Sequence, residues 1–303
     1  MRRPAIDVVL PARARLGECP VWDDRQQVLW WIDIDDRRIH RTDPSTGTDE
    51  VCVLAGRPGA IALTDADDRL VAGVEHDLVD VDWPSGIITS RVEVEAADRP
   101  TRLNDGRCDE RGRFWIGSMQ DPVDSGTFAG GFYRVDPEHR SRPDVHVAES
   151  DGVGITNGLA FSPDGRRMYW ADTPKATVWV YDLDLDAGTR SNRREFARFD
   201  GSGAPGLPDG ACVDADGCYW VACVTGGAVA RFAPDGRLDR VIEVPMRMPT
   251  MPAFGGTGLD TLFVTSIGGD GGVASAAPDD PMAGALVAID VGVSGLGEPR
   301  FGG

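Results

Sequence analysis

One unit recurs six times along nearly the whole chain, and this repetition constrains the fold more than any other feature. Each unit contains a short segment rich in aromatic and aliphatic residues. The spacing between equivalent positions is roughly 41 to 54 residues, which is within or near the period of β-propeller blades. The six segments are Leu29–Asp33, Leu70–Val74, Phe114–Ser118, Met168–Asp172, Tyr219–Cys223 and Leu262–Ser266.

The pattern within each unit predicts strands. The apolar runs are short, carry many Val, Ile, Trp, Tyr and Phe residues, and end at Asp-Gly or Gly-Gly turns. We therefore predict an all-β, six-bladed propeller formed by one domain, residues 1–303. The strand Ala5–Leu10 precedes the first unit, and Ala285–Val291 leaves the last unit one strand short. We expect the N-terminal strand to complete the C-terminal blade, because open strand edges promote aggregation.

Composition limits the partners of this protein. The formal net charge is -18 and the isoelectric point is near 4.5, which argues against nucleic-acid binding because phosphate contacts need a basic face. The six cysteines lack a disulfide-dense spacing, and no apolar run is long enough for a membrane helix. We expect a cytoplasmic protein that is a monomer or a weak homo-oligomer, with neither nucleic acid nor membrane as a partner.

A second series of equivalent positions precedes the six segments. If the blades are alike, these residues begin the innermost strands and surround one mouth of the central channel. Four of the six are Glu, Asn, Asn and Asp, whereas the other two show that the fold does not need a polar side chain there. The series is Glu18, Gly59, Asn104, Asn157, Asp209 and Met251.

Two carboxylates and amide oxygens facing one channel would repel each other unless a cation lay between them. The sequence therefore predicts a metal site. Oxygen ligands of this kind suit Ca²⁺, Mg²⁺ or Mn²⁺, while Zn²⁺ and Fe²⁺ are also compatible with the geometry. Three protein ligands would leave positions open for water and substrate, which is typical of catalytic sites.

A second acidic motif does not predict a metal site. Asp182, Asp184 and Asp186 resemble the start of an EF-hand loop, but the glycine is displaced to Gly188 and the final acidic position holds Arg193. We interpret this stretch as a solvent-facing strand and turn.

Several separated motifs resemble the senescence marker protein/gluconolactonase family, also called regucalcin-like. The resemblance extends over residues 14 to 300 or so. It implies a six-bladed propeller that binds one divalent cation and hydrolyses sugar lactones, and Ca²⁺ is our first candidate for that cation. The motifs are LGECPVW (16–22), RLNDGRCD (102–109) with RFWIGSM (113–119), TNGLAFSPDG (156–165), LPDGACVD (207–214) and PTMPAFGG (249–256).

The resemblance also implies roles for single residues. Glu18, Asn157 and Asp209 match the metal ligands of the family, and Asp209 matches its general base. Arg102 and Asn104 match the residues that hold the sugar. An acidic residue often follows the family's G-[ST]-M element, and here either Gln120 or Asp121 could take that place, as substrate-binding candidates.

The leading hypothesis is a metal-dependent lactonase that converts a pentono- or hexonolactone to its aldonic acid. One alternative is a non-catalytic calcium-binding or regulatory protein, which would use the same ligands but would not need Arg102 and Asn104. Another is a broader esterase or organophosphate hydrolase, for which we would expect a larger and more apolar pocket.

Overall fold

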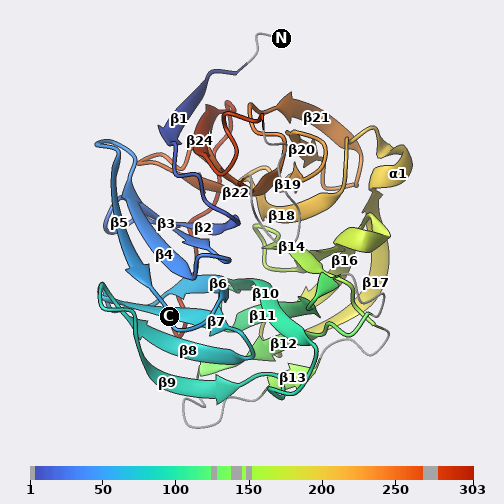
Figure 1. Cartoon of the computed structure of the whole chain (residues 1–303). Coiled ribbons are helices and arrows are strands. Elements are labelled where there is room, and N and C mark those ends of the chain that lie inside the picture. The colour runs from blue at the N-terminus through green and yellow to red at the C-terminus, as the bar shows by residue number, and fades with distance from the viewer. Residues whose placement is uncertain (1–3, 124–127, 138–144, 148–151, 269–278) are drawn as a thin grey trace.

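The structure is a computed structural model that describes residues 4–123, 128–137, 145–147, 152–268 and 279–303. Six four-stranded antiparallel sheets are arranged around a central channel (Figure 1), as predicted. The first two blades are β2 (Gly17–Asp23), β3 (Val28–Asp33), β4 (Arg38–Asp43) and β5 (Thr48–Val53), then β6 (Pro58–Leu63), β7 (Arg69–Val74), β8 (Asp77–Asp82) and β9 (Ile87–Glu93).

The third and fourth blades follow in chain order. They are β10 (Thr101–Cys108), β11 (Phe114–Gln120), β12 (Phe132–Val135) and β13 (Val145–Val147), then β14 (Thr156–Phe161), β15 (Arg167–Asp172), β16 (Thr177–Asp184) and β17 (Thr189–Arg198). The helical elements whose residues are all described are the 3-10 turn Thr173–Lys175 and the short α1 (Phe199–Ser202).

The fifth blade contains β18 (Pro208–Val213), β19 (Tyr219–Cys223), β20 (Ala228–Phe232) and β21 (Leu238–Glu243). The sixth contains β22 (Pro249–Gly255), β23 (Thr261–Ser266), β24 (Leu286–Asp290) and β1 (Ile6–Leu10). The strand β1 pairs with β24, with Ile6 opposite Ile289 and Val8 opposite Val287. This pairing confirms the prediction that the N-terminal strand completes the last blade.

The predicted aromatic-rich segments are the second strands of the blades, and each prediction lies within two residues of the observed bounds. Their side chains fill the space between blades. Trp30, Trp170 and Trp220 are almost completely buried, as are Tyr169 and Tyr219. Burying an aromatic side chain of this size contributes on the order of 2 to 3 kcal/mol to stability. All six cysteines are buried and unpaired.

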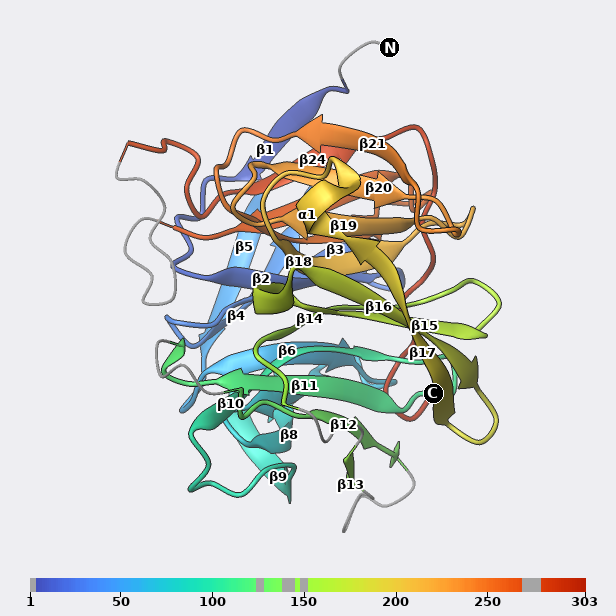
Figure 2. The ribbon, with the colours of Figure 1, turned by 90° about the vertical axis from the view of Figure 1, so that its right-hand side faces the viewer.

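The C-terminal segment, residues 295–303, makes backbone contacts with several of the blades. Gly295 forms a bridge with Asp214 in the fifth blade, and the Phe301 amide donates a hydrogen bond to the Leu63 carbonyl in the second. The Gly302 amide donates to the Gly112 carbonyl, beyond the third blade's inner strand. The segment therefore crosses one mouth of the channel, and Figure 2 shows the C terminus on that side of the disk.

Candidate metal and substrate site

The six innermost strands share a β-bulge at the predicted rim. In β10 the pairing moves from Asn104 opposite Gly117 to Gly106 opposite Ile116, so that Asp105 has no partner across the ladder. Equivalent register shifts occur in β2, β6, β14, β18 and β22, each at the rim position or directly beside it. A bulge bends its strand and redirects the side chains beside it. The directions of the rim side chains therefore differ from those expected for a regular strand, in which side chains alternate between the two faces.

Two asparagines join adjacent blades at this rim. Asn104 Nδ2 donates hydrogen bonds to the Thr156 carbonyl at 2.8 Å and to Asn157 Oδ1 at 3.1 Å. Asn157 Nδ2 donates to Thr173 Oγ1 at 2.9 Å, and that hydroxyl donates to the Pro208 carbonyl at 2.8 Å. The chain of bonds fixes the orientation of the Asn157 amide, with its oxygen facing Asn104.

The predicted acidic ligands, Glu18 and Asp209, lie close enough to affect each other's ionisation. Burial, followed by the charges of Asp209 and Asp105, raises the pKa of Glu18 well above its ordinary value. Burial, followed by the charge of Asp105, does the same to the pKa of Asp209. No arginine or lysine forms an ion pair with either carboxylate among the described residues. The charge of Arg102 lowers the pKa of Glu18 less than burial and the charges of Asp209 and Asp105 raise it, so the pair remains dominated by like charges and burial, which suits it to a cation.

Asp105 is a site residue that the sequence analysis missed. It is the extra residue of the β10 bulge, and its Oδ2 accepts a hydrogen bond from the Leu159 amide at 2.9 Å. Its Oδ1 is buried without a hydrogen-bond partner, and burial raises its pKa to about 6. It adds a third carboxylate to the electrostatics of the channel. In the sequence, only its position next to Asn104 indicated that Asp105 belongs to the site. The bulge that changes the direction of its side chain could not be predicted from the sequence.

The donor set is compatible with a divalent cation. Within the ranges that the structure describes, no three His, Cys, Asp or Glu side chains gather as a metal site. The proposed set has only two such residues, because its third donor is the amide oxygen of Asn157. Two buried carboxylates without an ion pair and an oriented amide oxygen are donors of the kind that Ca²⁺ and Mg²⁺ prefer.

Arg102 lies beside these residues. Its Nη1 donates to Asn104 Oδ1 at 2.8 Å and to the Leu103 carbonyl at 3.0 Å, while the side chain is buried. Both Nδ2 hydrogens of Asn104 are already used within the protein, so Asn104 could only accept a further hydrogen bond. Arg102 thus places a buried guanidinium, with its hydrogen-bond donors, beside the Asn104 oxygen.

The two remaining substrate-binding candidates have different environments. Gln120 is buried, and its Oε1 accepts a hydrogen bond from the Ala129 amide at 3.3 Å. Asp121 is partly exposed, and its Oδ2 accepts a hydrogen bond from Arg57 Nη2 at 2.5 Å. Arg57 was not among the predicted site residues, and it also pairs with Glu75 at 3.0 Å.

Steric crowding explains why glycine occupies the second rim position, Gly59. A Cβ atom at Gly59 would collide with the carbonyl oxygen of Leu103, which belongs to the neighbouring blade. Glycine therefore allows β6 to approach the strand that carries Arg102 and Asn104. The absence of a polar side chain at Gly59 reflects this close approach.

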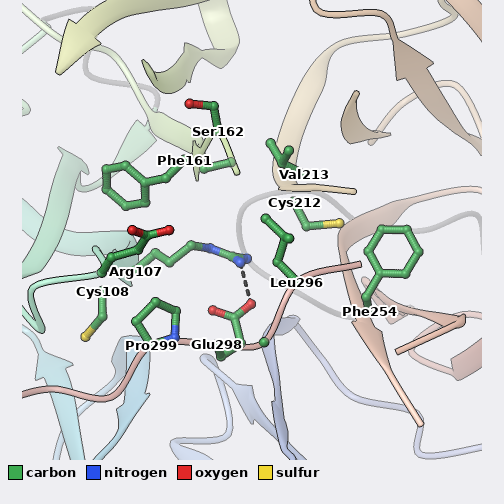
Figure 3. A pocket seen from close by; sticks show the side chains of 13 residues that line it. Arg107, Cys108, Phe161, Ser162, Cys212, Val213, Phe254, Leu296, Glu298 and Pro299 are labelled. Atoms are coloured by element: carbon green, nitrogen blue, oxygen red, sulfur yellow. Dashed lines mark hydrogen bonds and ion pairs between the residues drawn. The ribbon is translucent and has the colours of Figure 1, made fainter. Parts of the chain in front are cut away.

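A pocket of about 230 Å³ lies at the opposite mouth of the channel. Its lining comes from the far ends of the innermost strands and from the C-terminal segment, and Arg107 reaches Glu298 across it (Figure 3). None of the predicted metal or substrate residues lines this pocket. Its largest hydrophobic contributors are Phe161, Phe254 and Leu296. The pocket is therefore separate from the rim described above.

The fold and the rim define a class: a six-bladed β-propeller with oxygen donors from separate blades at one end of its channel. Residues 16–268 match the family model of the SMP-30/Gluconolactonase/LRE-like region. The chain belongs to this family.

Several relatives match nearly the whole chain. A 6-deoxy-6-sulfogluconolactonase of Pseudomonas putida is 42% identical over 290 residues, with 95% of each chain covered. A pentonolactonase of Haloferax volcanii is 36% identical, with 96% of each chain covered. An L-arabinolactonase of Azospirillum brasilense is 35% identical, with 99% of this chain and 97% of the relative covered.

Solved structures of similar proteins have the same fold. A calcium-binding protein, regucalcin, from Agrobacterium tumefaciens superposes with a TM-score of 0.88 at 29% identity and covers 99% of this chain and 98% of its own. A luciferin-regenerating enzyme superposes with a TM-score of 0.87 at 28% identity, covering 98% of this chain and 99% of its own. In the described part of the chain, no helix is long and apolar enough to cross a membrane.

Proposed function

We propose that this protein is a lactonase that hydrolyses aldonolactones of pentoses or hexoses to aldonic acids and uses a divalent cation. The observation that carries the proposal is the meeting of Glu18 and Asp209 near the Asn104–Asn157 pair, with Arg102 alongside. The lactonase names of the relatives support the reaction class.

Glu18, Asn157 and Asp209 would hold the cation. Ca²⁺ is our first candidate because the donors are all oxygens, and the calcium-binding title of the Agrobacterium protein supports it. Zn²⁺, Mn²⁺, Mg²⁺ and Fe²⁺ are the alternatives. A bound cation would supply Lewis-acid polarisation of the lactone carbonyl and stabilise negative charge that develops on its oxygen.

Asp209 acts as the general base in this proposal. Burial and the neighbouring Asp105 raise the pKa of Asp209 in the cation-free protein, and a bound cation would lower it, so that the carboxylate is ionised and able to accept a proton. A positioned base that accepts the proton of the attacking water typically accelerates a reaction by about 10² to 10⁴. The opening of the ring then yields a carboxylate and a hydroxyl group.

Arg102 orients the substrate. Its Nη1 is fixed by Asn104 Oδ1 and the Leu103 carbonyl, so the guanidinium plane is held in one position before a sugar binds. Preorganised donors of this kind reduce the entropy that binding costs and align the carbonyl carbon with the attacking water. Asn104 adds an acceptor, and Gln120 or Asp121 extends the wall.

Two other functions use parts of the same site. A non-catalytic calcium-binding protein would need the cation ligands but not the fixed guanidinium of Arg102. A broader esterase would need an apolar wall, whereas the side chains beside Arg102 are the charged groups Arg57, Glu75 and Asp121. Both observations favour a hydroxylated substrate.

The test is a pH-indicator assay with a panel of pentono- and hexonolactones. The protein is stripped of metal, and single cations are added back at known free concentration. We expect hydrolysis above the spontaneous rate only when a cation is present. Cation binding measured by calorimetry without hydrolysis of any lactone would favour the calcium-binding alternative, and preference for simple aryl esters would favour the esterase.

A further inference from the structure

A cluster of charged side chains lies beside Arg102, the residue proposed to orient the substrate. We define this cluster as Arg57, Glu75 and Asp121. Arg57 Nη2 lies 3.0 Å from Glu75 Oε2 and 2.5 Å from Asp121 Oδ2, and the Arg57 amide donates to Glu75 Oε1 at 2.9 Å. One guanidinium is thus shared by two carboxylates that come from different blades.

Backbone contacts place the cluster against the strand that carries Arg102. The Leu103 amide donates to the Glu75 carbonyl at 2.7 Å, and the Asp121 amide donates to the Pro100 carbonyl at 3.0 Å. Arg57 is two residues before Gly59, which packs against Leu103. The side chains of Arg57, Glu75 and Asp121 are 32%, 36% and 26% exposed, so a ligand at this mouth can reach them.

The charge of this wall is negative despite its two arginines. Burial, followed by the charge of Arg57, lowers the pKa of Arg102, while Asp121, Asp35 and Glu75 act in the opposite direction. The charged groups with the largest effect on Arg102 are therefore one further guanidinium and three carboxylates. The charge of Arg57 is already matched by Glu75 and Asp121 at hydrogen-bond distance.

An ion-paired cluster suits hydroxyl groups better than anions. Its guanidinium hydrogens donate and its carboxylate oxygens accept, and a hydroxyl can do both. A sulfonate, phosphate or carboxylate only accepts hydrogen bonds, and here it would approach two carboxylates whose shared guanidinium is occupied. Unfavourable charge contacts of this type are a common source of specificity against a competing ligand.

We propose that Arg57, Glu75 and Asp121 determine specificity by selecting lactones whose distal carbons carry hydroxyl groups and by rejecting lactones with an anionic group there. This inference rests on the proposed lactonase function. It assigns Arg57 a role in fixing the two carboxylates, and it assigns the repulsion to Glu75 and Asp121 together, because two carboxylates share one guanidinium.

The test compares hydrolysis of D-glucono-1,5-lactone with hydrolysis of the same lactone bearing a sulfonate on its sixth carbon. We expect kcat/KM of the unaltered protein to favour the unsubstituted lactone at least about tenfold. Asp121→Asn should shift this ratio several-fold toward the sulfonated lactone, and the shift should shrink in 0.5 M salt as charges are screened. Glu75→Gln provides a second variant if Asp121→Asn does not fold.

The matched control is Asp65→Asn. Asp65 makes an exposed ion pair with Arg25 in the turns at the far ends of the first two inner strands, so this variant changes the net charge equally without touching the cluster. Equal shifts from Asp65→Asn and from both cluster variants would overturn the inference, as would a preference of the unaltered protein for the sulfonated lactone. If the unaltered protein hydrolysed no lactone with any cation, the proposed function itself would fall.

Discussion

Arg300 Nη2 donates a hydrogen bond to Asp23 Oδ1 at 2.6 Å and so attaches the C-terminal segment to the first blade. Arg300 Nη1 also donates to the Thr64 carbonyl at 2.8 Å. Although burial opposes ionisation of Asp23, its hydrogen bond and charge contact with Arg300 lower the pKa of this carboxyl. The last residues of the chain therefore hold two neighbouring blades together at the mouth opposite the candidate site.

Truncating this contact should destabilise the propeller. The side chains of Asp23 and Arg300 are 1% and 8% exposed, so Arg300→Ala leaves a buried carboxylate without its partner. Losing one partner of a buried pair costs on the order of 3 kcal/mol. The matched control is Arg25→Ala, which breaks the exposed pair with Asp65 and should cost less than about 1 kcal/mol. Urea unfolding of both variants would measure the difference, and equal losses would contradict a special role for Arg300.

The propeller could be predicted from the sequence because each blade repeats the same short local pattern. Each blade contributes an aromatic strand and a turn, and the repeat places Glu18, Asn104, Asn157 and Asp209 at equivalent positions in β2, β10, β14 and β18. Closure by the N-terminal strand was also predictable, since the last unit lacked one strand.

Contacts between distant segments could not be predicted in the same way. The aspartates Asp109 and Asp214 each bind an arginine of their own blade, Arg113 and Arg231. At the corresponding turn of the first blade, Asp23 instead binds Arg300, which no periodic pattern indicates. The rim bulges and the shared guanidinium of Arg57 likewise depend on how neighbouring blades pack.

The contribution of Glu18 and Asp209 to the stability of the cation-free protein should fall as the pH rises. Burial and like charges raise the pKa values of Glu18 and Asp209, so the folded protein retains protons that the unfolded chain, with carboxyl pKa values of about 4, has already lost. Folding is therefore favoured at low pH by this pair, and the contribution is lost as pH rises through the raised pKa values.

Asp209→Asn isolates this effect. Without the Asp209 charge, the variant should gain stability relative to the unaltered protein between pH 5 and pH 8, by about 1.4 kcal/mol for each unit by which the pKa was raised. Denaturant unfolding in a chelator at several pH values would measure the gain. Adding Ca²⁺ should stabilise the unaltered protein more than the variant. A pH-independent difference between the two proteins would contradict a raised pKa of Asp209 in the folded protein.

Arg102→Ala should affect sugar lactones more than simple esters. Arg102 is proposed to bind the sugar and not to activate water, so the loss of kcat/KM should be at least about tenfold larger for a hexonolactone than for a small ester without hydroxyl groups. Steady-state kinetics with both substrates would measure the two losses. Circular dichroism provides the folding control, and equal losses on both substrates would mean that Arg102 supports the site in general.

Asp209→Asn should also separate the two catalytic duties proposed for this residue. Asparagine keeps an oxygen donor of similar size but removes the basic carboxylate, so cation affinity should weaken modestly while turnover falls by about 10² or more. Glu18→Gln is the matched variant, because it removes a ligand charge without removing the proposed base. Calorimetry would give the affinities, and initial rates at saturating cation, corrected for spontaneous opening, would give turnover. If Asp209→Asn kept near-parental kcat when loaded with cation, the proton of the attacking water would have to go elsewhere. Water activated at the cation without help from Asp209 would then be the better mechanism.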